Sequence, residues 1–451
     1  GSATAMVASR GAAVLPTVEP GTAGAQAALI RRRAGEVRGP WIRSQGVSVT
    51  RHAAAMRPFR SGEFGRGAAG PSEGHLQAVN ELLLGLRRQL IAASDQVRES
   101  GARAAAQPTT RQLQSLVMAK ERAHDWVRAI ERIWDFYFEL FGQRQSVLAD
   151  WLLSCDRIAL SCYQAAYLGV GQPKPLPAPP PFCYARTGFS PATFRRGIPL
   201  RRLGRQLNPF PLVQLPYHRL VNPWTLGAVL HECSHNLQSD LGLNKAVPVA
   251  IGRRLLADDC PPAVVQAWVR WNREIFADLA ALLLGGPAVV GSLLDVVGRS
   301  PHAVLAYNPR GPHPTPYFRV YLSTELLRRM GFPDQAERYA ALWSRIYPDP
   351  RAGSLPRPLI ETFDVAHRSV VDALCFRPFA QLGNCSLSEV IKFGDKEQQM
   401  TLEAAERLAA GTDPGIIPAR LLIGAARSAL DRGLARPGVI TRNFYTELAR
   451  R

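Results

Sequence analysis

Long apolar runs are missing from this 451-residue chain. Its longest uncharged stretches, residues 158–173 and 279–294, are shorter than the roughly 20 residues that a transmembrane helix needs. Gly285, Gly286 and Pro287, residues that break helices, also interrupt the second stretch. We therefore expect a soluble protein without a membrane span. A hydrophobic content of 46% is enough for a substantial core.

Paired cysteines are also lacking. The chain has seven cysteines, an odd number, and no Cys-x-x-Cys pair. This usage favours reduced thiols and a cytoplasmic location over a disulfide framework. No signal peptide is visible at the N-terminus, and a leader that has already been removed is the alternative. The cysteines are Cys155, Cys162, Cys183, Cys233, Cys260, Cys375 and Cys385.

Acidic residues are scarce relative to basic ones, so the formal net charge is +19. Residues 1–75 contain ten arginines against four acidic residues and no sustained apolar period, which predicts a flexible basic extension. Between Arg157 and His231 there is no acidic residue at all. Nonspecific binding to nucleic acid or another polyanion is expected at low salt, but no nucleic-acid-binding motif accompanies the charge. A solvated arginine-rich surface is the simpler interpretation.

Helical periodicity dominates the remaining sequence, because apolar residues recur at three- and four-residue steps. The periodic segments are 76–99, 110–140, 335–347, 358–375, 396–410, 418–434 and 439–450. We expect a mainly α fold, with α+β as the alternative and a small β-sheet at most. The expected regions are a basic extension (1–75), a helical N-terminal lobe (76–172), a Pro/Arg-rich linker (173–205), a catalytic core (206–347) and a helical C-terminal region (348–451).

The run His231-Glu232-Cys233-Ser234-His235 carries the chemistry of the chain. Residues four apart on a helix project from one face, so the two imidazoles can share one metal ion. Asn222 and Pro223 before the run, and Gly242 after it, suit the start and the end of such a helix. Zinc prefers nitrogen and oxygen ligands and keeps one position for water in catalytic sites. Glu232 can then act as general base and afterwards as general acid.

A second helical pattern supplies the missing ligand. It runs from Pro261 to Gly286, and its apolar positions leave Glu274 and Asp278 together on one side, four residues apart. Acidic side chains in an apolar element are costly unless they have partners. A metal for Glu274 and a histidine N–H for Asp278 would provide them. The alternative is an ordinary surface helix with two histidines, and carboxylates that pair with arginines.

At these residues the chain resembles the gluzincin metallopeptidases, the clan of thermolysin-like enzymes. The resemblance covers residues 222–285, and the interval between His235 and Glu274 is longer than that of thermolysin, so the particular family is unassigned. It implies a zincin-like catalytic lobe with one Zn²⁺ per chain, held by His231, His235 and Glu274. It also implies that Asp278 accepts a hydrogen bond from a zinc-bound histidine, with His231 as the expected donor.

The segment 311–319 looks like the His-Pro segment, with a following arginine, that comes after the glutamate ligand in HtpX-like peptidases. A side chain here could donate a hydrogen bond to the oxyanion of the tetrahedral intermediate. The candidates are His313, Tyr317 and Tyr321. Arg319 is a candidate for substrate binding, or else it braces a carboxylate. A proline-rich turn with packed aromatic residues is the alternative for the whole segment.

One short stretch, residues 211–221, has a weak extended pattern and could pair with a peptide substrate. The sequence as a whole predicts a zinc metallopeptidase that acts on peptides or proteins, including substrates with acidic groups that the basic segment would attract. Two alternatives stay open. One is a polyanion- or partner-binding regulator on a metallopeptidase fold, and the other is a zinc amidohydrolase for a non-peptide amide.

Overall fold

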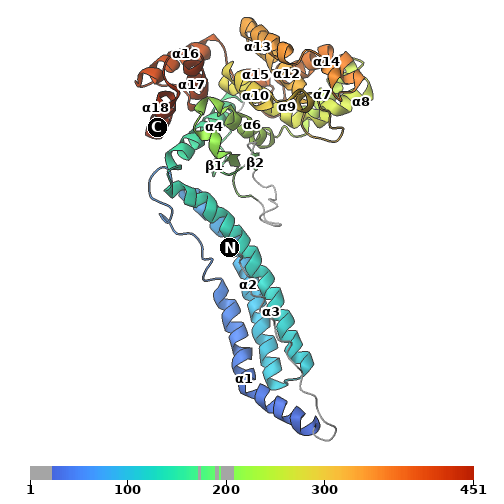
Figure 1. Ribbon diagram of the computed structural model, residues 1–451, viewed down its shortest axis with the longest axis vertical. Coiled ribbons are helices and arrows are strands. Elements are labelled where there is room, and N and C mark those ends of the chain that lie inside the picture. The colour runs from blue at the N-terminus through green and yellow to red at the C-terminus, as the bar shows by residue number, and fades with distance from the viewer. Residues whose placement is uncertain (1–22, 171–173, 188–191, 195–207) are drawn as a thin grey trace, which may run out of the picture. The chain divides into compact units, whose positions relative to one another are not determined.

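The computed structural model describes residues 23–170, 174–187, 192–194 (backbone only) and 208–451. These residues form a mainly helical protein with three short strands, which confirms the predicted fold class (Figure 1). No helix in the described part is long and apolar enough to cross a membrane. Residues 1–22 of the predicted extension, and residues 173, 188–191 and 195–205 of the predicted linker, lie outside the described residues.

The chain divides into two compact units. Unit 1 combines Gly1–Arg57 with Leu83–Glu131, and unit 2 combines Pro58–Leu82 with Arg132–Arg451. The division falls within helices α2 (Glu73–Ala106) and α3 (Thr110–Gly142). It differs from the predicted regions, since the end of the expected N-terminal lobe and the whole C-terminal region belong to the same unit as the expected catalytic core.

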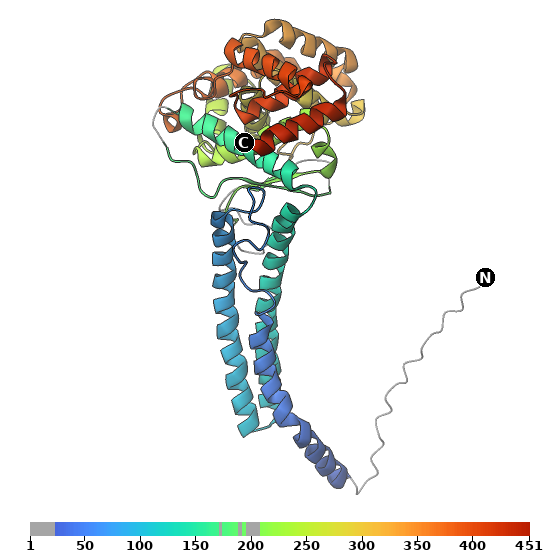
Figure 2. The same cartoon turned by 90° about the vertical axis from the view of Figure 1, so that its left-hand side faces the viewer.

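In unit 1, helix α1 (Ala23–His52) lies beside α2 and α3 (Figure 2). The Oγ1 atom of Thr50 is 2.6 Å from the Oγ atom of Ser94, and the ring of His52 packs against that of His124. The prediction of a flexible extension is therefore wrong for residues 23–52. The buried positions of α1 all lie in its second half and are Ile42, Gln45, Gly46 and Val49. An apolar period this short does not stand out in the sequence among the glycines and arginines.

Unit 2 holds the other helices. They are α4 (Ala149–Gly169), α5 (Tyr217–Leu220), α6 (Gly227–Asp240), α7 (Ala246–Ala257), α8 (Pro262–Arg270), α9 (Asn272–Gly285), α10 (Ala288–Val297), α11 (Pro301–Val304), α12 (Pro316–Arg329), α13 (Pro333–Ile346), α14 (Arg357–Cys375), α15 (Leu387–Val390), α16 (Asp395–Ala410), α17 (Leu422–Asp431) and α18 (Pro437–Arg450). Short 3-10 turns cover Gln143–Gln145, Pro223–Thr225, Pro350–Ala352, Ala380–Leu382 and Ala419–Leu421. The predicted helical segments are confirmed, with boundary shifts of up to seven residues, the largest at the end of α2.

The β-sheet is small and has the strand order β1-β3-β2. Strand β3 (Leu212–Leu215) pairs in parallel with β1 (Phe182–Ala185) and antiparallel with β2 (Ala192–Phe194). Of the extended stretch predicted at residues 211–221, only Leu212–Leu215 forms a strand, because α5 follows Pro216 directly. Strand β3 is the central strand and both of its edges are paired, so the hypothesis that a substrate pairs with it is wrong.

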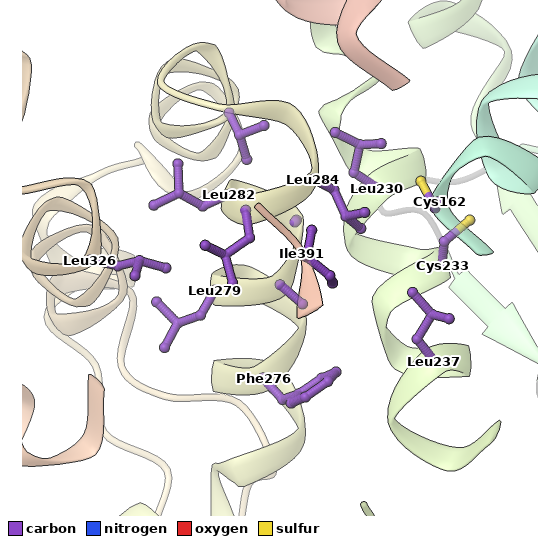
Figure 3. Close-up of a cluster of buried hydrophobic side chains, with 14 of the residues drawn as sticks. Cys162, Leu230, Cys233, Leu237, Phe276, Leu279, Leu282, Leu284, Leu326 and Ile391 are labelled. Atoms are coloured by element: carbon purple, nitrogen blue, oxygen red, sulfur yellow. The ribbon is translucent and has the colours of Figure 1, made fainter. Parts of the chain in front are cut away.

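The core of unit 2 forms where α6 packs against α9. Leu230 and Leu237 of α6 belong to the same buried cluster as Phe276, Leu279 and Leu284 of α9, and Figure 3 shows Leu230 next to Leu284. Gly285 permits close approach of the two helices, because a Cβ atom there would lie 2.5 Å from Cδ1 of Leu230. Apolar burial of this kind contributes about 25 cal/mol per Å², and it fixes the two helices that carry the motif.

All seven cysteines are unpaired, and six of them are buried. Cys233, which lies between the two histidines of the motif, faces the core beside Cys162 of α4 (Figure 3). It is therefore a packing residue, as its position on the opposite side of a helix predicts.

A cluster of arginines around Asp372 ties three helices together. The carboxylate of Asp372, on α14, accepts hydrogen bonds at 2.6 Å from Arg254 of α7, at 2.8 Å from Arg329 of α12 and at 2.8 Å from Arg377. Partial burial raises the pKa of Asp372, but the hydrogen bonds from the arginines outweigh this effect and hold the pKa well below its usual value. The cluster therefore stabilises the fold most when Asp372 is ionised.

Candidate metal centre

Helix α6 presents the motif on the side opposite to its core residues. The helix begins at Gly227, after the 3-10 turn Pro223–Thr225, rather than directly at Asn222 as the sequence suggests. It ends at Asp240, and Gly242 adopts a φ of 73°, which glycine tolerates best. Because Leu230, Cys233 and Leu237 face the core, His231 and His235 project together from the other side.

The second helical pattern is two helices in the structure, not one. Helix α8 ends at Arg270, Trp271 is fully buried at the junction, and α9 begins at Asn272. Glu274 therefore lies in the first turn of α9, with Asp278 one turn further along. Both carboxylates are buried, with exposed fractions of 9% and 5%.

The two helices bring three candidate ligands together. One donor atom from each of His231, His235 and Glu274 lies within 4.8 Å of the other two. Nε2 of His231 is 3.4 Å from Oε1 of Glu274, and Nε2 of His235 is 2.7 Å from Oε2 of the same carboxylate. The sequence predicted this set, and the described residues contain no other such group of three or more histidine, cysteine or acidic side chains.

The donor set fits zinc. Two ligands about 2.05 Å from a zinc ion in a tetrahedron are about 3.3 Å apart, close to the 3.4 Å between His231 and Glu274. Two imidazole nitrogens and one carboxylate are also a ligand combination of catalytic zinc sites, and they leave a fourth position free. The charges agree with this assignment, because three carboxylates, Glu232, Glu274 and Asp278, line the cavity against the two guanidinium groups of Arg273 and Arg319.

Asp278 orients one of the histidines. Its Oδ1 atom lies 2.9 Å from Nδ1 of His231, the partner expected from the sequence. This contact turns Nε2 of His231 toward Glu274, since the two ring nitrogens point in opposite directions. Burial alone would lower the pKa of His231, but hydrogen bonds to Asp278 and Glu274 raise it to about 10. Burial would raise the pKa of Glu274, and its contacts with His231 and His235 instead lower it.

Arg319 braces Asp278. Its Nε and one terminal nitrogen lie 2.8 and 2.9 Å from the two carboxylate oxygens, a bidentate pair. The side chain of Arg319 is only 11% exposed, and that of Asp278 only 3%. Of the two roles that the sequence left open, the structure favours the bracing role over substrate binding.

Glu232 is a buried residue whose side chain lines the cavity of the site. Its nearest ionic neighbour is Nε2 of His231, 4.0 Å from Oε1, and no described residue hydrogen-bonds to it. Burial raises the pKa of Glu232, and the charges of His231 and His235 oppose this shift. A carboxylate with a raised pKa is suited to accept and return a proton near neutral pH.

These side chains line one cavity of about 400 Å³. Small-molecule sites have volumes of roughly 300–1,000 Å³, so the cavity can hold a short piece of peptide. One wall is polar and includes the ligands. The other is apolar and comes largely from α9 and α10, through Ala281, Val289, Leu293 and Val296.

His313 lines the same cavity, as predicted. Its Nε2 atom is 3.4 Å from Oε1 of Glu274, while its side chain is 64% exposed. This histidine precedes α12 and stands at the opening, where its ring nitrogen can reach a bound molecule.

Tyr317 lies elsewhere. With Tyr321 it lines a different cavity, and its ring packs against those of Phe318 and Tyr321. Trp343 donates a hydrogen bond to the carbonyl of Tyr317, which further fixes this position. The prediction of a catalytic role for Tyr317 is therefore not supported. Helix α12 begins at Pro316, so residues 317 and 319 are about 200° apart on the helix and cannot both face the site.

The sequence did not point to Arg273, which also lines the cavity. Arg273 precedes Glu274 and is half-buried. The sequence does contain a signal for Arg273. The small residue Ala281 follows Arg273 by eight positions and Glu274 by seven, and residues at such spacings share a helix face. Arg273 is therefore expected on the same face of the helix as Glu274.

Comparison of the chain with models of protein families, with curated proteins and with solved structures finds no match. The interpretation of the site therefore rests on its own geometry.

Proposed function

We propose that the protein is a zinc-dependent metallopeptidase. The observation that supports this most is the convergence of His231, His235 and Glu274, with donor atoms within 4.8 Å of one another and the carboxylate of Glu232 beside them in a cavity. Zinc held by these three residues would supply a Lewis acid that lowers the pKa of water and polarises a carbonyl group.

The residues of the chain then have distinct tasks. Glu232 takes a proton from the attacking water on its carboxylate and delivers it to the leaving amine. His313 donates a hydrogen bond from Nε2 to the carbonyl oxygen of the substrate, where negative charge develops. Asp278 and Arg319 hold the ring of His231 in place. The apolar wall excludes water from the side chain next to the bond that is cleaved.

The buried, unpaired cysteines support a reducing compartment, and we place the protein in the cytoplasm. Its partner in this proposal is a peptide or protein substrate.

Elemental analysis of the purified protein tests the metal site. We expect one zinc per chain, and its loss in both His231→Ala and Glu274→Ala. His302→Ala is the matched control, because His302 is exposed on α11 away from the cavity and its removal should leave the zinc in place. A protein that takes up no zinc even after supplementation would contradict the proposal.

Cleavage of a mixed peptide library, followed by mass spectrometry, tests the reaction. The parent protein should cleave peptides, and Glu232→Gln should retain its zinc but lose activity by several orders of magnitude. Equal activity of the two proteins would show that the mechanism is wrong. Hydrolysis of small non-peptide amides, with peptides left intact, would favour an amidohydrolase.

A further inference from the structure

Arg273 differs from the other charged groups of the cavity because its guanidinium forms no close ion pair; burial lowers its pKa, and the negative charge of the adjacent Glu274 only opposes this shift. Glu274 contacts both histidines, and Asp278 is shared by His231 and Arg319. Among the described residues, none forms an ion pair or a hydrogen bond with the guanidinium of Arg273. The cavity is thus lined, beside the candidate metal ligands, by the half-buried guanidinium of Arg273, whose N–H groups are available to a bound molecule.

The nearby Arg270, by contrast, does have hydrogen-bond partners. Arg270, one turn earlier, donates to the carbonyl oxygen of Gly311 at 2.9 Å and lies 3.3 Å from the hydroxyl of Tyr307. It therefore holds the loop that leads to His313. Arg273 makes no contact of this kind, so its side chain contributes little to holding the fold together.

The position of Arg273 is also unfavourable for its helix. It lies in the first turn of α9, where the helix dipole favours anions and disfavours cations. Neither the helix nor a partner explains an arginine here, whereas a ligand in the cavity would.

We propose that Arg273 determines the substrate specificity of the site by binding a carboxylate of the substrate beside the metal ligands. This inference rests on the proposed peptidase function. The guanidinium offers a planar fork of N–H donors that matches a carboxylate in a bidentate pair. The partly enclosed cavity strengthens such a pair relative to bulk water.

In a peptide, the carboxylate has two sources: a free C-terminus or an acidic side chain. Both present the same group to Arg273, and the apolar wall formed by Val289, Leu293 and Val296 suits an aliphatic residue next to it. The substrate class is therefore a peptide with a negative charge close to the bond that is cleaved.

Binding measurements with four peptides separate the two sources. The first pair is acetyl-Ala-Ala-Leu-Ala with a free C-terminus and with a C-terminal amide. The second pair is acetyl-Ala-Glu-Leu-Ala-amide and its glutamine counterpart. Dissociation constants are measured by calorimetry on zinc-loaded Glu232→Gln protein, which should bind the peptides without cleaving them. The same background then carries Arg273→Met, Arg273→Lys or, as a control, Arg253→Met on the exposed side of α7.

We expect one acidic peptide to bind about 10- to 100-fold more tightly than its neutral partner, the range for charge-assisted bidentate hydrogen bonds. The pair that shows the difference identifies the source. Arg273→Met should abolish the difference, Arg273→Lys should retain part of it, and Arg253→Met should retain all of it. Equal binding within both pairs, or a preference that survives in Arg273→Met, would overturn the inference. The latter result would mean that the carboxylate binds the metal instead.

Cleavage of the same peptides by the protein with Glu232 intact separates the two proposals. Cleavage without a charge preference would reject the role of Arg273 and leave the peptidase function standing. Charge-selective binding that depends on Arg273, without cleavage of any peptide, would reject the peptidase function and support Arg273 as the anchor of a carboxylate ligand.

Discussion

Replacement of Asp278 by asparagine separates the structural role of this residue from its effect on the metal. Asp278 is 5% exposed and accepts two hydrogen bonds from Arg319, at 2.8 and 2.9 Å. A neutral amide at this position would remove the carboxylate that pairs with the buried charge of Arg319 and leave only the more distant Glu274, 3.9 Å away. Breaking a buried pair in this way costs about 3–5 kcal/mol of unfolding free energy, and we expect a loss of that size in Asp278→Asn.

The same substitution should weaken zinc binding. Nδ1 of His231 lies 2.9 Å from Asp278, and loss of such a carboxylate contact lowers metal affinity about 10- to 100-fold. Urea denaturation of the metal-free protein measures the first effect, and competition with a chromophoric chelator measures the second. The two assays are independent, because the stability measurement contains no metal.

Arg319→Met is the matched variant, since it removes the guanidinium but leaves Asp278 as the acceptor for His231. We expect it to reduce zinc affinity less than Asp278→Asn does. The double variant should be more stable than the sum of the two single effects predicts, because no buried arginine charge remains. If Asp278→Asn unfolds at the same urea concentration as the parent and binds zinc equally well, the structural reasoning about this pair is wrong.

Three further outcomes follow from single contacts. Glu232→Gln should keep one zinc per chain by elemental analysis and unfold within about 1 kcal/mol of the parent, because no described residue hydrogen-bonds to the carboxylate. Asp372→Asn should cost about 1–2 kcal/mol at pH 6, since its arginine partners are partly exposed. The pKa of Asp372 is lower in the folded state, so this difference should be complete above about pH 4 and shrink as the pH falls toward 2 in acid titrations of unfolding. Gly286→Ala should cost more than about 2 kcal/mol in urea denaturation, because Gly286 has a φ of 79° and an added Cβ would lie 2.1 Å from the ring of Phe393. In a Phe393→Ala background the same substitution should cost less but not nothing, because the clash is gone and the backbone strain remains.

The sequence predicts most of the helices in unit 2 because their apolar periods are long and regular. It predicts the ligand set because the spacing within α6, and that between Glu274 and Asp278, are each set by a single helix. It does not reveal the break at Trp271, since both sides of the break are apolar and continue the same period. Nor does it place Tyr317, whose direction depends on where α12 begins. Arg273 is missed for a different reason, because only the three-dimensional structure places it in the cavity without a hydrogen bond or a close ion pair among the described residues.

Removal of the metal tests the centre without any substitution. Three buried carboxylates, Glu232, Glu274 and Asp278, line one cavity, where Arg319 contacts Asp278 at 2.8 Å and Glu274 at 3.9 Å. Zinc would add positive charge among these carboxylates and would bind only the folded protein, because α6 and α9 must pack to bring its ligands together. At a free zinc concentration about 1,000-fold above the dissociation constant, such binding adds about 4 kcal/mol to the unfolding free energy. Chelation should therefore lower the unfolding temperature of the parent by several degrees and leave that of His235→Ala almost unchanged, and a parent protein indifferent to chelator would show that the three ligands do not hold a metal.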